Sequence, residues 1–176
     1  TFGRVKWALQ VRRLQDEALL STKEKGEYLG GFEGGGILRV MSAVRGNRKA
    51  RPLGLYNPSE ALLFAQKALE TPSATYPPFA EPFSGSDFHE NYYYIAQSKV
   101  ALGIESGNKH FIEEAKEELV DSLDFLNDLE EIKELPKGRE PETRFYMGMM
   151  EDLLGNIEKC SVKEHWKSCL AKSFDA

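Results

Sequence analysis

Three histidines are the residues of this chain best suited to acid–base chemistry or metal binding, and they stand far apart in the sequence. His89, His110 and His165 each fall in the first turn of a different predicted helix. A di-iron bundle needs Glu-x-x-His on two helices and a zinc hydrolase needs His-Glu-x-x-His, and neither motif occurs in the sequence. We therefore predict no catalytic residue, no metal and no cofactor. The alternative is an enzyme that uses one of these histidines as acid or base in a pocket between helices.

The only two cysteines could form a disulfide or a redox pair. Cys160 and Cys169 are nine residues apart, in a stretch predicted to be mainly one helix. A helical rise of about 1.5 Å per residue separates them by roughly 13 Å. A disulfide needs Cα atoms within about 7 Å of each other. The spacing therefore predicts two reduced, half-buried thiols.

A glycine-rich run over residues 30–36 could approach a phosphate closely, because glycine backbone carries no side chain. The Lys-Ser/Thr pair that completes a phosphate-binding loop is absent. We interpret the run instead as part of an irregular segment that becomes ordered on a partner. This interpretation is supported by five apolar residues on a stretch too irregular to form its own core: Leu29, Phe32, Ile37, Leu53 and Leu55.

Basic and aromatic side chains around this segment are the candidate partner-binding residues. A basic loop follows the glycine-rich run, isolated aromatics lie within it, and at least one of three consecutive tyrosines at 92–94 must face a surface or groove. A single basic cluster on an acidic chain favours a protein partner over nucleic acid. The predicted partner-binding residues are Tyr28, Phe32, Arg45, Arg48, Lys49, Arg51 and Tyr92.

Helical periodicity and capping residues predict the elements that must position these side chains. Helices are expected over residues 4–20, 37–44 and 59–70, the last capped by Asn57. A capping box of Asp87 with Glu90 opens the next helix, which ends near Gly107. The buried face of that helix is expected to comprise Tyr93, Ala96, Val100 and Ile104.

Three further helices are predicted in the last third of the chain. Asn108 caps a helix over 110–135, a helix over 142–155 follows Pro141, and a capping box of Ser161 with Glu164 starts a helix over 162–174. The core face of the first is predicted as Ile112, Ala115, Leu119, Leu123 and Leu126, and that of the second as Phe145, Met149 and Leu153.

Composition describes a soluble globular domain whose charge is unevenly spread. The 176 residues are 41% hydrophobic and 29% charged with a net charge of −5, and no apolar run approaches the roughly 18 residues of a membrane span. Residues 1–56 hold eleven Lys or Arg against five Asp or Glu, and residues 57–176 hold twelve against twenty-three. A basic, glycine-rich front therefore precedes an acidic, regular body.

Two segments resemble tetratricopeptide-type helical hairpins: YYYIAQSKVALGI as a first helix and EALLFAQKALETP as a second helix. The resemblance covers residues 57–126 and implies stacked helical hairpins. The predicted second helices start at Asn57, Asn108 and Ser161, which are 51 and 53 residues apart, whereas that family repeats about every 34 residues and carries a Trp-x2-Leu-Gly-x2-Tyr signature that this chain lacks. A closed antiparallel bundle is the alternative.

The sequence thus predicts an all-α fold, with an N-terminal helix and extended basic segment over 1–56 and a helical domain over 57–176. The expected function is a non-enzymatic protein–protein interaction, as an accessory or assembly subunit of a larger complex. A small-ligand or pigment-contacting helical protein is a further alternative, and peripheral membrane association stays open. A start at Thr1 is consistent with a processed chain in an organelle or exported compartment, or with a piece of a longer chain.

Overall fold

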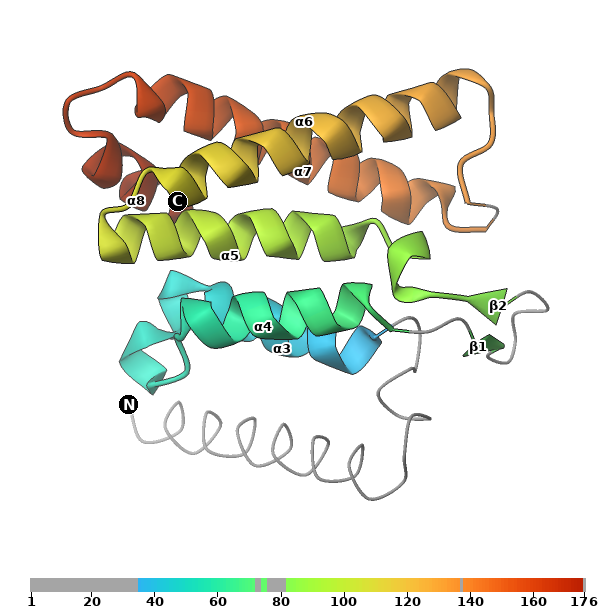
Figure 1. The fold of residues 1–176 in the computed structure, drawn as a ribbon, viewed down its shortest axis with the longest axis horizontal. Coiled ribbons are helices and arrows are strands. Elements are labelled where there is room, and N and C mark those ends of the chain that lie inside the picture. The colour runs from blue at the N-terminus through green and yellow to red at the C-terminus, as the bar shows by residue number, and fades with distance from the viewer. Residues whose placement is uncertain (1–34, 72–73, 76–81, 137, 176) are drawn as a thin grey trace.

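The computed structural model describes residues 35–71, 74–75, 82–136 and 138–175, and these confirm the predicted all-α fold (Figure 1). The predicted helix over 4–20 and the candidate residues Tyr28 and Phe32 lie outside the described part. Among the described helices, none is both long and apolar enough to cross a membrane.

The first described helices form an antiparallel pair. Helix α3 (Gly36–Gly46) confirms the short helix predicted there, the 3₁₀ helix η1 (Arg48–Leu53) follows it, and α4 (Pro58–Leu69) begins after Asn57. The side-chain oxygen of Asn57 accepts a hydrogen bond of 3.2 Å from the backbone N–H of Glu60, which confirms the predicted N-cap. Leu55, which we expected to face a partner, is buried within the protein itself.

A short antiparallel pair of strands, β1 (Ala74–Thr75) and β2 (Pro82–Phe83), leads through the 3₁₀ helix η2 (Gly85–Asp87) to α5 (Glu90–Ser106). The predicted capping box of Asp87 with Glu90 is wrong. Asp87 instead closes a box with Ser84, from whose backbone N–H it accepts a bond of 2.6 Å. The tighter 3₁₀ turn uses the cap three residues earlier, so α5 begins without a side-chain cap.

Helices α6 (His110–Glu131), α7 (Glu140–Ser161) and α8 (Trp166–Asp175) complete the described chain. The predicted faces of α5 and α6 are confirmed, because every residue in both sets is buried. The predicted face of α7 is wrong in part. Phe145 is 62% exposed, and the buried row of α7 runs instead through Met147, Met150, Leu153 and Ile157.

Helix α5 lies at the centre of the molecule. It contacts α3 and α4 on one side and α6 and α7 on the other, while α8 packs against its C-terminal part. Figure 1 shows α5 between α4 and α6, with α3 behind α4 and α7 behind α6. Small residues allow this close packing, since Ala96, Ala101 and Ala115 have no exposed surface.

A buried ionic network joins three of these helices. Glu90 at the start of α5 lies 3.3 Å from Nε of Arg39 on α3 and 2.9 Å from Nη2 of Arg139, which immediately precedes α7. Both guanidinium groups stack on the ring of Phe88, at 4.4 and 3.9 Å from its centroid, and Arg139 also pairs with Glu142. The buried carboxylate of Glu90 thus lies between two buried guanidinium groups, and Glu142, whose side chain is 50% exposed, adds a second negative charge at the edge of the network.

Removing Arg139 takes from the buried carboxylate of Glu90 the two charge-assisted hydrogen bonds, of 2.9 and 3.2 Å, that it accepts from Nη2. We expect Arg139→Met to lower the free energy of unfolding by about 3 kcal/mol, measured by urea denaturation. Arg144→Met is the matched control, because Arg144 lies five residues further along the chain, on α7, and pairs with Glu130 at an exposed position. Such an ion pair contributes less than about 1 kcal/mol. Equal losses in the two variants would contradict a structural role for the network.

Candidate functional site

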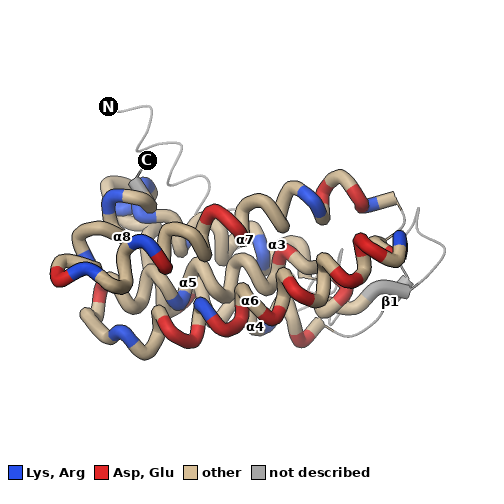
Figure 2. The backbone as a smooth tube through the Cα atoms, turned by 90° about the horizontal axis from the view of Figure 1, so that it is seen from above, with Lys and Arg blue, Asp and Glu red and all other residues tan. Residues whose placement is uncertain are grey.

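A basic groove of about 1050 Å³ lies between η1, the C-terminal end of α5 and α8. Five Lys or Arg line it against two Glu, and its apolar wall comes from the end of α5 and from one side of α8. Figure 2 shows Lys and Arg gathered around α8, whereas Asp and Glu follow α6. The groove is lined by Arg48, Arg51, Ile104, Glu105, Lys163, Glu164, His165, Trp166, Lys167, Ser168, Cys169, Ala171 and Lys172.

Glu105 organises one wall of the basic groove. Its carboxylate pairs with Arg51 and accepts a hydrogen bond of 3.3 Å from the hydroxyl of Tyr56. The guanidinium of Arg51 also stacks on the Tyr56 ring, at 4.9 Å from its centroid. Burial and the negative charge of Glu105 raise the pKa of Tyr56 to about 12, so this hydroxyl stays neutral. The backbone carbonyl of Glu105 accepts a bond of 3.5 Å from Nζ of Lys167 on α8.

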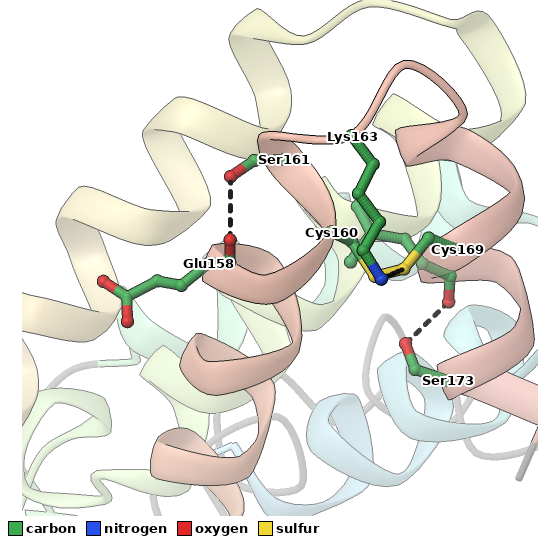
Figure 3. The surroundings of a disulfide bond; sticks show 7 residues. Glu158, Cys160, Ser161, Lys163, Cys169 and Ser173 are labelled. Carbon is green, nitrogen blue, oxygen red and sulfur yellow. Dashed lines mark hydrogen bonds between the residues drawn. A yellow bond between two sulfur atoms is a disulfide. The ribbon is translucent and has the colours of Figure 1, made fainter.

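The wall formed by α8 is covalently joined to α7, because Cys160 and Cys169 form a disulfide (Figure 3). The prediction of two separated thiols is therefore wrong. Helix α7 ends at Ser161 and α8 begins only at Trp166, so the intervening turn brings the two Cα atoms to 5.5 Å. Nζ of Lys163 lies 3.5 Å from the sulfur of Cys169.

The residue Ser161, predicted as the cap that starts the last helix, lies at the end of α7 instead. Its hydroxyl donates a bond of 3.4 Å to the carbonyl of Glu158 in the preceding turn (Figure 3). The backbone N–H of Lys163 then bonds to the carbonyl of Cys160 at 3.0 Å, which closes the turn. The sequence signal at Ser161 marked a break between helices correctly but placed the new start too early.

The four basic residues of the predicted loop lie in different surroundings. Arg48 and Arg51 line the groove. Arg45 does not, because its half-buried guanidinium lies 3.3 Å from Glu60 and donates to the carbonyl of Leu55, so it joins α3 to α4. Lys49 is exposed and lies outside the groove lining.

Sequence reasoning missed the three lysines of the groove that lie more than 110 residues beyond the basic loop. Lys163, Lys167 and Lys172 come from α8 and the turn before it. Their spacing of four and five residues was visible as a basic side of the last predicted helix. Only the packing of α8 against α5 and η1 shows that this side faces Arg48 and Arg51.

A second hollow, the aromatic hollow, lies at the other end of α5 and measures about 1120 Å³. It contains the predicted residue Tyr92, whose ring stacks with that of His89 at 6.4 Å between centroids, and the ring of Phe125 lies 6.0 Å from His89. Its lining comprises Ser86, Asp87, His89, Tyr92, Asp121, Ser122, Phe125, Leu129, Ile132, Lys133, Glu134, Leu135 and Pro136.

The three histidines lie in three different places. His89 is buried in the wall of the aromatic hollow, His165 lines the basic groove, and His110 is exposed on α6 with Nε2 3.5 Å from Glu114. Within the described residues, no group of three or more His, Cys, Asp or Glu is arranged to hold a metal ion. Of the three, His89 combines burial with a position in a hollow.

No known protein family, curated protein or solved structure matches this chain.

The surroundings of His89 make stability depend on pH. Burial and the positive charge of Arg139 lower the pKa of His89 from its usual 6.5, although Asp87 acts in the opposite direction. The unfolded chain then binds a proton at His89 at a higher pH than the folded chain does, so the free energy of unfolding falls as the pH drops below about 6.5.

We expect His89→Asn to lose less stability than the natural protein between pH 7.5 and 5.5. The difference is at most about 1.4 kcal/mol, the limit set by one pH unit below 6.5, and urea denaturation at the two pH values measures it. His110→Asn should behave like the natural protein, because the His110 side chain is 69% exposed. If the stability of His89→Asn depends on pH as that of the natural protein does, protonation of His89 is not the cause of the loss of stability at low pH.

Proposed function

We propose that this protein is a non-enzymatic interaction protein, an accessory or assembly subunit of a larger complex, which binds an acidic segment of a protein partner in the basic groove. The observation that carries the proposal is the assembly of one basic surface from η1 and α8, two segments far apart in a chain whose net charge is −5. Lys and Arg side chains that gather on one surface of a negatively charged protein attract an anionic partner to that surface and orient it.

The lining of the groove favours a protein segment over nucleic acid. Its floor includes the buried side chain of Ile104 and the half-buried ring of Trp166, which suit apolar side chains between acidic ones. Glu105 and Glu164 also line the groove, and many Asp and Glu follow α6 (Figure 2). A nucleic acid carries a charge at every phosphate and meets these carboxylates along its whole length, whereas an acidic protein segment can place uncharged residues beside them.

The packing of the helices supports a stack of helical hairpins of the tetratricopeptide type over a closed bundle. The helices can be grouped into three hairpins, α3–α4, α5–α6 and α7–α8. The first helix of each hairpin then contacts the first helix of the next, since α5 contacts both α3 and α7. Stacked hairpins bury a continuous core through such contacts and leave extended surfaces for partners. The basic groove lies where the last hairpin meets the first turn after α3.

Reversing charge in the groove should weaken binding of the partner. We expect Lys167→Glu combined with Lys172→Glu to weaken binding at least tenfold at 150 mM salt, because two attractive charges become repulsive. The measurement is affinity capture from the native source, with mass spectrometry of bound proteins, followed by fluorescence anisotropy with an acidic peptide from the captured partner.

The matched control is Lys49→Glu combined with Lys67→Glu, which changes the net charge equally at exposed positions outside the groove. This control should retain the partner. Circular dichroism verifies that both double variants fold. A partner that is retained by the groove variant, or lost equally from both, would contradict the proposal.

A further inference from the structure

The aromatic hollow has the properties of a second docking surface, independent of the basic groove. It exposes large apolar side chains, since Phe125 is 54% and Ile132 is 61% exposed. Both residues line a concavity of about 1120 Å³ rather than a convex surface. Exposed apolar groups gathered in a concave site are typical of protein interaction surfaces.

Carboxylates surround these apolar side chains. Asp87, Asp121 and Glu134 line the hollow, and Lys133 is the one Lys or Arg among its lining residues. The charge is therefore opposite to that of the basic groove, where Lys and Arg outnumber Glu. A cationic group beside an apolar one complements this combination of carboxylates and rings.

The aromatic rings can accept a cation on their faces. Burial and Asp87 raise the pKa of Tyr92, which keeps its hydroxyl neutral. Burial and Arg139 lower the pKa of His89, which keeps its imidazole free of positive charge near pH 7. Glu90 and Glu142 offset part of the positive charge of Arg139, and Asp87 and Asp121 supply carboxylates in the lining itself. Lys and Arg side chains bind favourably over such rings.

We propose that the aromatic hollow binds a segment of a protein partner in which a Lys or Arg stands next to an apolar side chain. The cation contacts the ring of Tyr92 and the carboxylate of Asp121, and the apolar side chain packs on Phe125 and Ile132. This inference goes beyond the proposed function, because it adds a second site of opposite charge at the other end of α5. The protein then connects an acidic segment of one partner with a basic segment of another.

The test uses two fluorescein-labelled peptides of equal length that repeat Lys-Leu-Ala or Gln-Leu-Ala. Fluorescence anisotropy at 150 mM salt measures their binding to the full chain. We expect the lysine peptide to bind at least tenfold more tightly than the glutamine peptide. Phe125→Ala and Asp121→Asn should each weaken the lysine peptide about fivefold or more.

Two matched controls separate the hollow from general attraction to an acidic protein. Phe145→Ala removes another exposed phenylalanine, and Asp124→Asn removes another carboxylate of α6, and neither residue lines the hollow. Both should bind the lysine peptide within twofold of the natural protein. The proposal is overturned if the controls weaken binding as much as the hollow variants do, or if the two peptides bind equally.

Self-association provides the remaining outcome. If sedimentation of the natural protein shows a concentration-dependent dimer that Phe125→Ala abolishes, a second copy of this chain occupies the hollow and the proposed occupant is wrong. If this proposal fails, the proposed function of the basic groove is not affected. Lys167 and Lys172 lie on α8, beside the opposite end of α5 from the aromatic hollow. The two proposals are therefore tested separately.

Discussion

The rest of the fold depends on the burial of Glu90 between two arginines. A carboxylate at the start of α5 is withdrawn from water only because Arg39 and Arg139 reach it from α3 and from the residue preceding α7. Such a network contributes little net stability compared with apolar packing, but it is costly to leave incomplete. Helix register along α5 is constrained accordingly, since sliding α3 or α7 by one turn would separate the charges. Both hollows are built against the helix that this network holds.

The sequence predicted the helices whose apolar faces repeat regularly, and it was less informative where long-range packing decides. The row from Ile112 to Leu126 was correct because α6 is covered on one side by α5 and α7, which is the arrangement that periodicity assumes. For α7 the same rule chose Phe145, which is exposed, because the buried side of that helix is shifted toward Met147 and Met150. The disulfide was missed for a related reason, since a four-residue turn between two helices changes a separation that helical rise alone predicts.

The candidate sites, too, were predicted only in part, because they depend on contacts between distant segments of the chain. The division of charge along the chain predicted that basic residues near 45–51 would be functional, and Arg48 and Arg51 do line a hollow. Arg45 instead forms an ion pair with Glu60, and the other cations of the groove come from α8. In the part of the chain that the structure describes, cations from η1 and from the otherwise acidic body gather around α8, whereas Asp and Glu follow α6 (Figure 2). Neither the contribution of α8 nor the combination of Tyr92 with Phe125 follows from local spacing, because both need contacts between distant helices.

The central position of α5 also sets a distance. Tyr92 in one hollow and Ile104 beside the other are twelve residues apart on one helix, which corresponds to roughly 18 Å along its axis. Two segments seated at these ends are therefore held at a fixed spacing by a rigid helix. When both belong to one larger assembly, engagement of the first raises the effective concentration of the second and turns two weak contacts into one durable attachment. Under the two proposals, the number of turns in α5 therefore sets the distance between the two bound segments.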